Sequence, residues 1–216
     1  KYFDDKSRIF EFNKDENDEG MSFLKKHNLE KGKYICFIIR TAEYYNSVSK
    51  SERERNYNYR NVDQKNYIST LNYLIKNQYK VIRMGKGTKT KFPFEHKNFI
   101  DYSLSEDRSD FLDIWLSANC KFFLHSGTGI GVIPLLFNIP MVSTEQMSPL
   151  RTLSWFPKSI HLPRPIKNIN GKMLNIKEII EFGLHWKVAQ SDYDKIKIKP
   201  LENEPREILE AVIEME

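Results

Sequence analysis

The chain has 216 residues, 40% of them hydrophobic and 13% aromatic, and a formal net charge of +5 at pH 7. This composition can fill a hydrophobic core and excludes a disordered chain. No apolar run reaches the length of a membrane span, and the opening residues KYFDDKSRIFEF lack the pattern of a signal peptide. We therefore expect a cytoplasmic protein whose two cysteines, Cys36 and Cys120, stay reduced in the core.

Short apolar runs and amphipathic stretches alternate along the chain. A polar excursion is expected over residues 41–60, and four prolines predict an irregular stretch after the last strand. The expected strands are 33–40, 80–83, 99–102, 121–124 and 140–143. The expected helices are 18–28, from Asn61 or Asp63 to about 78, 110–119 after a Ser109 cap, 130–137, 176–184 and 205–215. This order predicts an α/β fold, a Rossmann-like parallel sheet with helices on both faces.

The stretch KFFLHSGTGIGVIPLL, residues 121–136, is typical of a buried strand, a glycine-rich turn and the start of a helix. In the turn, Ser126, Gly127, Thr128 and Gly129 allow backbone N–H groups to face a ligand, which suits a phosphate. A tight structural connection between strand and helix explains the same glycines equally well. The residues that follow the neighbouring strands distinguish the two interpretations.

Ligands of parallel sheets bind outside the carboxyl ends of the strands. Arg40, Arg83 and Asp101 follow the first three expected strands, the turn at 126–129 follows the fourth, and Glu145 follows the fifth. Two arginines beside a glycine-rich turn favour a diphosphate pocket, because a guanidinium group pairs with two oxygens at once.

Each of these side chains also has a structural interpretation. Arg40 has an alternative partner in Glu43, and Arg83 has one in Asp101 or Asp107. His125 suits a packing position or, less simply, a general base.

Basic residues gather in two loops, within residues 80–97 and 146–176, and the second of these contains no acid. Such loops attract a nucleotide diphosphate, an anionic glycan or a lipid headgroup. No nucleic-acid-binding motif accompanies them, so we expect no nucleic acid.

Several other kinds of site are excluded or disfavoured. The sequence Gly85-Lys86-Gly87-Thr88 lacks the upstream glycine of a P-loop, and GTGIG differs from the GxGxxG of dinucleotide-binding proteins. No zinc spacing occurs, and the triplet Asp192-Tyr193-Asp194 is interpreted as a surface turn and not as a metal site. We therefore expect no bound metal.

Four segments together carry a family resemblance: ICFIIRTAEYY, YRNVDQKNYISTLNYLIKNQYKVIRMG, FIDYSLSEDRSDFLDIWLSANCKFFLHSGTGIGVIP and a later SPL. In order and spacing, from about residue 16 to 150, they resemble a group of bacterial glycosyltransferases from surface-polysaccharide loci. More distantly, the pattern is similar to the donor-binding half of fucosyltransferase-like GT-B enzymes. The resemblance implies transfer of a sugar from a nucleotide diphosphate donor, without a resident cofactor or metal.

The resemblance also implies roles for particular residues. Arg40 and the turn at 126–129 would hold the diphosphate and stabilise its charge as it leaves. The place of Arg83 at a strand end adds it to this set. Where the family has a histidine and an acid around the arginine, this chain has Ile38 and Thr41. If that acid is the catalytic base, another must replace it. Asp101 and Glu145 are candidates, and Glu145 alternatively binds ribose hydroxyls.

We expect a linker or remnant at 1–16, a nucleotide-sugar-binding domain at 17–200 and an acidic helix at 201–216. The expected partners are a nucleotide diphosphate sugar, a glycan or lipid-linked acceptor, a domain on the N-terminal side, and the inner face of a membrane through peripheral contact. Two alternatives stay open. One is a non-catalytic domain that binds nucleotide sugars or glycans, and the other is a sugar-nucleotide epimerase of the same architecture.

Overall fold

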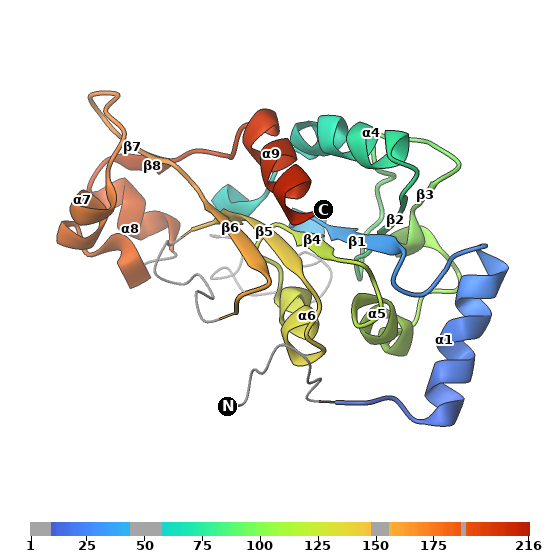
Figure 1. The fold of residues 1–216 in the computed structure, drawn as a ribbon. Helices are drawn as coiled ribbons and strands as arrows, with labels where there is room; N and C mark the ends of the chain where they lie inside the picture. Colours follow the sequence, from blue (N-terminus) through green and yellow to red (C-terminus); the bar gives the residue numbers. More distant parts are fainter. Residues whose placement is uncertain (1–9, 44–57, 148–155, 187–188) are drawn as a thin grey trace.

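The computed structural model describes residues 10–43, 58–147, 156–186 and 189–216 (Figure 1). The helices are α1 (Lys14–Lys26), α4 (Ile68–Lys76), α5 (Asp110–Ser117), α6 (Val132–Leu136), α7 (Ile176–Glu181), α8 (Gln190–Lys195) and α9 (Pro205–Met215). The strands are β1 (Tyr34–Ile38), β2 (Lys80–Arg83), β3 (Phe99–Ile100), β4 (Phe123–His125), β5 (Met141–Gln146), β6 (Ser159–Pro163), β7 (Ile166–Asn168) and β8 (Ile198–Pro200). Short 3₁₀ helices lie at Asn58–Arg60, Gln64–Tyr67, Tyr102–Leu104, Gly129–Gly131 and Leu184–Trp186.

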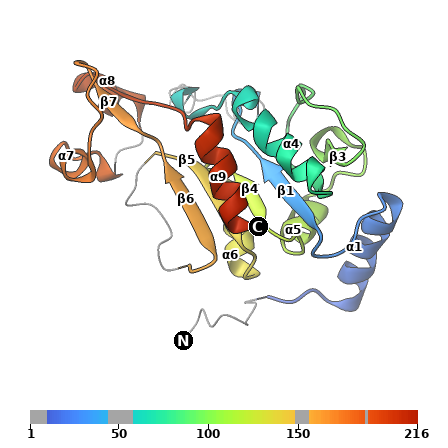
Figure 2. The same ribbon diagram turned by 45° about the horizontal axis from the view of Figure 1, so that its top comes forward.

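Six strands form one parallel sheet in the order β3-β2-β1-β4-β5-β6. The change of direction between β1 and β4 is the point where ligands bind in open sheets of this kind. Helices α4 and α9 cover one face, and α5 and α6 cover the other, with α1 packed against α5 (Figures 1 and 2). The predicted Rossmann-like α/β fold is confirmed.

Each face of the sheet has its own hydrophobic core. On one face, Tyr67, Leu71 and Leu74 pack with Ile208 and Val212 of α9. On the other face, α1 approaches α5 closely. A Cβ built on Gly20 would lie 2.1 Å from the Trp115 ring, so only glycine fits at this position. The central strand β1, YICFI, lies between the two cores and is buried over four of its five residues.

The structure differs from the predictions at several elements. Helix α1 begins at Lys14 instead of residue 18, because Asn13 and Glu16 form a capping box. The expected helix 130–137 is a 3₁₀ turn followed by the five residues of α6. The triplet Asp192–Asp194 lies on α8 and not in a turn, and its central Tyr193 is buried.

The irregular stretch expected after the fifth strand contains two further strands, β6 and β7. Strand β6 extends the parallel sheet, and β7 pairs antiparallel with β8, which follows α8, in a small second sheet. Pro163 and Pro165 flank the link between β6 and β7, where they remove no hydrogen bond of a central strand.

Across the described ranges, no helix combines the length and the apolar character that crossing a membrane requires. In the same part of the chain, no three His, Cys, Asp or Glu side chains are grouped as metal ligands.

Candidate functional site

A pocket of about 400 Å³ lies at the carboxyl edge of the sheet, where β1, β2 and β4 end. It is bounded by the ends of these strands and by one side chain of α5. Its lining residues are Ile38, Ile39, Arg40, Thr41, Arg83, Met84, Gly85, Lys86, Thr88, Asp113, Thr128, Gly129 and Ile130. The predicted residues Arg40, Arg83, Thr128 and Gly129 are therefore brought together in one cavity.

Arg40 is fixed to the glycine-rich turn through its backbone. Its N–H donates to the Ser126 hydroxyl at 2.7 Å, and its carbonyl accepts from the N–H of Val62 at 3.3 Å. Ser126 is buried and does not line the pocket. Its hydroxyl thus positions the arginine, a role that differs from the predicted contact with a diphosphate.

The turn itself divides into a supporting half and a lining half. Gly127 has a φ of +60°, which favours glycine, and its carbonyl accepts from Arg60 at 3.4 Å. Thr128 and Gly129 line the pocket. Because α6 has only five residues, an anion here would meet the turn residues Thr128 and Gly129 and the guanidinium of Arg40 more than a helix dipole.

Arg83 and Asp101 form an ion pair, as the structural interpretation of Arg83 predicted. The Arg83 Nη1–Asp101 Oδ2 distance is 2.8 Å, and the same nitrogen donates to the Thr90 carbonyl at 3.0 Å. The other oxygen of Asp101 accepts from the Ser103 hydroxyl at 2.6 Å. Asp101 lies in a neighbouring hollow lined by 94–97, outside the Arg40 pocket. These contacts are those of a residue that holds Arg83 in place. They give no support for Asp101 as the catalytic base.

Glu145 does not have the exposure that binding of ribose hydroxyls requires. Its side chain is 0% exposed and its Oε2 lies 2.7 Å from the Nε of Arg164, itself 2% exposed. Asn203 receives a hydrogen bond from the Glu145 N–H and donates its own N–H to Oε1. Burial raises the pKa of Glu145 to about 7, although Arg164 and Asn203 act in the opposite direction. This carboxyl group is a structural element of the fold.

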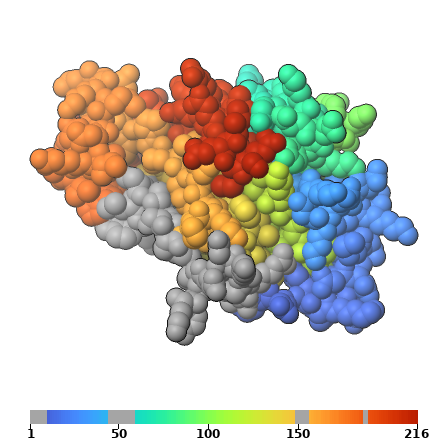
Figure 3. Space-filling view, viewed as in Figure 1, coloured from blue at the N-terminus to red at the C-terminus, as the bar shows by residue number. Residues whose placement is uncertain are grey.

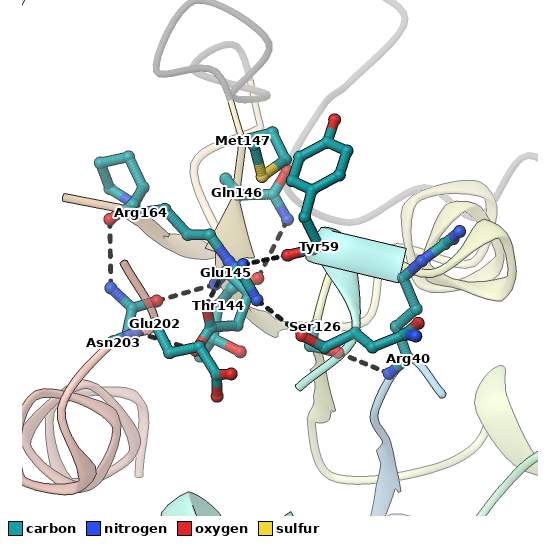
Figure 4. A network of polar contacts seen from close by, with 12 residues as sticks. Arg40, Tyr59, Ser126, Thr144, Glu145, Gln146, Met147, Arg164, Glu202 and Asn203 are labelled. Atoms are coloured by element: carbon teal, nitrogen blue, oxygen red, sulfur yellow. Dashed lines mark hydrogen bonds and ion pairs between the residues drawn. The ribbon is translucent and has the colours of Figure 1, made fainter. Parts of the chain in front are cut away.

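The Glu145–Arg164 pair connects three distant segments beside the pocket (Figure 4). Arg164 donates to the carbonyls of Tyr59 at 2.6 Å and Asn61 at 3.0 Å. Val62, directly after Asn61, donates to the carbonyl of Arg40. The pair therefore holds the chain segment on which the backbone position of Arg40 depends.

Asp113 is a pocket residue that sequence reasoning missed. It projects from α5 into the lining and contacts the Nη2 of Arg108 through Oδ2, whereas its buried Oδ1 has no hydrogen-bond partner among the described residues. Burial is the main cause that raises its pKa, and Arg108 opposes the rise. The sequence feature that could have identified Asp113 is an acidic residue on the buried face of an apolar helix, between Leu112 and Trp115.

His125 is a packing histidine. Its ring is buried against Gly131, where a Cβ would lie 2.4 Å from Cε1, and Thr128 N–H faces its Nδ1 at 3.4 Å. Burial, with a smaller contribution from His161, lowers its pKa to about 3. The ring is absent from the pocket lining, so the general-base alternative has no geometric support.

The pocket combines three kinds of surface. Ile38, Ile39, Met84 and Ile130 offer apolar walls, the arginines offer cations, Thr128 and Gly129 contribute the turn, and Asp113 offers a buried acceptor. A flat heterocycle joined to an anionic diphosphate carries groups that match all three.

No protein-family model and no curated protein sequence matches this chain. Its fold is similar to a crystal structure described as the glycosyl transferase family 9 from Veillonella parvula, with a TM-score of 0.58 and 11% sequence identity. The match covers 95% of this chain and 52% of that one, so the chain spans about half the length of that protein. At this identity the likeness concerns the fold, a Rossmann-like unit that matches one half of a GT-B glycosyltransferase.

Proposed function

We propose that this chain is the donor-binding domain of a glycosyltransferase of surface-polysaccharide synthesis, which uses a nucleotide diphosphate sugar. The observation that carries the proposal is the meeting of Arg40, Thr128, Gly129, the apolar walls and Asp113 in one pocket at the switch point of the sheet. The glycosyltransferase-like fold and the sequence resemblance support it.

In this reaction an acceptor hydroxyl oxygen bonds to the anomeric carbon while the bond from that carbon to the diphosphate oxygen breaks. The diphosphate leaves with the electron pair, so negative charge grows on it. Arg40 and the turn residues Thr128 and Gly129 stabilise that charge more in the transition state than in the ground state. Arg83, held by Asp101, adds positive charge to the wall, and Asp113 accepts a hydrogen bond from an N–H or O–H of the donor.

The acceptor and the catalytic base lie outside the pocket in this proposal. A glycan or lipid-linked acceptor and its base belong to a second domain on the N-terminal side, which the resemblance and the half-length match support. The proposal places the enzyme in the cytoplasm, at the inner face of the membrane.

A thermal-shift panel of nucleoside diphosphates and nucleotide sugars tests the donor site. We expect one nucleotide to stabilise the wild type and to lose this effect in Arg40→Ala. Arg206→Ala is the matched control, because Arg206 is exposed on α9, away from the pocket. If none of the nucleotides stabilises the wild type, the donor-site assignment is refuted.

A non-catalytic binding domain is the second candidate. It is favoured by Ile38 and Thr41, which line the pocket where the resembled family carries a histidine and an acid. Incubation of the full chain with the stabilising nucleotide sugar separates the two candidates, since slow hydrolysis or transfer of the sugar indicates an enzyme and binding alone indicates a binding domain.

A further inference from the structure

A small lobe with its own core projects from one end of the main sheet. It consists of β7, α7, α8 and β8, and it forms the orange to red-orange end of the molecule in Figure 3. Ile166, Ile179, Leu184 and Tyr193 fill its interior. The lobe is therefore a folded unit that can present a fixed outer surface.

That outer surface carries large apolar side chains within one short segment. Ile169 is 71% exposed, and Met173, Ile176, Ile180 and Phe182 are between 43% and 59% exposed. On α7, Ile179 covers the core of the lobe and is buried, whereas Ile176 and Ile180 are exposed. The helix therefore has apolar side chains on its outward side as well. Clustered exposed apolar residues mark an interaction surface.

The local fold brings these residues to the outside of the lobe. Lys167 forms a β-bridge with Met173, and the N–H of Asn168 donates to the carbonyl of Lys172 at 2.9 Å, so residues 166–174 form a hairpin with Ile169 near its tip. Ile176 and Ile180 are four residues apart on α7 and share one face of that helix.

The charges around this surface favour an anionic partner. Residues 166–199 contain seven lysines against four acids, and the sequence has no acid from 146 to 177. The lysines of the hairpin, Lys167 and Lys172, are exposed beside Ile169 and Met173. Lys172 and Glu178 pair with each other, and Lys177 and Glu181 lie 3.9 Å apart. The excess positive charge of the lobe therefore comes from its other exposed lysines, Lys167, Lys195, Lys197 and Lys199. Apolar side chains bordered by lysines are typical of peptide surfaces that lie in the headgroup region of anionic bilayers.

The lobe also emerges on the side of the sheet where the pocket lies. Strand β6 runs parallel to the other strands, and the link to β7 leaves from its carboxyl end. The pocket opens at the carboxyl ends of β1, β2 and β4. The chain therefore enters the lobe from the same edge of the sheet at which the pocket lies.

We infer that the hairpin at 166–174 and α7 dock this protein on the surface of a bilayer that contains anionic phospholipid. Ile169, Ile176 and Ile180 enter the headgroup region, while Lys167 pairs with a lipid phosphate. This contact uses no residue of the pocket and does not depend on nucleotide binding.

Co-sedimentation with vesicles tests the inference, using phosphatidylcholine with and without phosphatidylglycerol. We expect binding to the anionic vesicles only, and a roughly tenfold or greater loss, about 1.4 kcal/mol, in the triple variant Ile169→Ser, Ile176→Ser, Ile180→Ser. Val132→Ser with Ile213→Ser is the matched control, because these side chains are similarly exposed outside the lobe. Thermal unfolding verifies that each variant is folded.

Three outcomes would overturn the inference. The first is an absence of wild-type binding to the anionic vesicles, and the second is undiminished binding by the triple variant. The third is a wild-type dimer, seen by sedimentation velocity, that the triple variant abolishes while vesicles bind neither form, because a second copy then covers this surface. The nucleotide panel is read separately, so failure here leaves the donor-site result intact.

Discussion

The guanidinium of Arg164 and the carboxyl group of Glu145 form a buried ion pair with an Nε–Oε2 distance of 2.7 Å, between the end of β5 and the end of β6. Glu145 has a φ of +60°, which is uncommon for a residue with a side chain and costs free energy. At this strained backbone position, the pair connects the main sheet to the segment before Val62 and to the segment at Asn203.

Removal of Arg164 leaves a buried carboxyl group without its cation. We expect Arg164→Ala to lower the free energy of unfolding by about 3–5 kcal/mol, measured by urea denaturation. Glu145→Gln in the same chain should recover part of this loss, because the neutral amide needs no cation. Equal losses in the single and double variants would contradict an electrostatic origin.

The raised pKa of Glu145 gives stability a pH dependence of known sign. Because its folded value, about 7, exceeds the ordinary value of 4.5, the folded state binds the proton more tightly, and this group's contribution falls as pH rises from about 4.5 to 7. The maximum change is about 3 kcal/mol. The lowered pKa of His125 has the opposite effect, since stability from that group rises with pH up to about 6.5.

The two effects are separated by comparing variants. Glu145→Gln should show a stability that rises more steeply between pH 4.5 and 7 than that of the wild type, measured by chemical denaturation at each pH. A variant curve parallel to the wild-type curve would show that Glu145 does not change its protonation between these limits.

Asp113 should contribute to ligand binding more than to the fold. We expect Asp113→Asn to weaken binding of the stabilising nucleotide roughly tenfold, because the amide replaces a charged acceptor in a buried wall. Isothermal titration calorimetry measures the change. Asp107→Asn is the control: Asp107 also pairs with a cation, Lys26, but it lies outside the pocket lining. Equal effects of both substitutions would contradict a specific role of Asp113 in the pocket.

The contact of α1 with α5 depends on Gly20. Its Cβ position lies 2.1 Å from atoms of the fully buried Trp115 ring, so Gly20→Ala should lower the unfolding free energy by about 1–3 kcal/mol despite the better helix propensity of alanine. Gly129→Ala is the control, because nothing lies within 4 Å of its Cβ position. Thermal or urea unfolding measures both, and a stabilised Gly20→Ala would contradict the observed packing.

Local sequence patterns were sufficient for most of the main sheet. Strands β1 to β4 are short apolar runs in the sequence. The Ser109 hydroxyl accepts the N–H of Leu112 at the start of α5, as its spacing predicts. The sixth strand was missed because Ser159–Pro163 is half-buried, polar at two positions and closed by proline, so it has no continuous apolar run. Its place at the sheet edge stabilises it through pairing with β5.

The sequence by itself determined the Rossmann-like fold and the edge of the sheet where Arg40, Arg83, Thr128 and Gly129 meet, since apolar period and strand order suffice for both. Only the tertiary structure decided which polar side chains face the pocket. Asp101 and Glu145 follow strand ends as Arg40 does, yet each is engaged by an arginine from another segment. Such pairings form between residues up to 19 positions apart along the chain, and side-chain direction follows from packing, which local patterns do not encode.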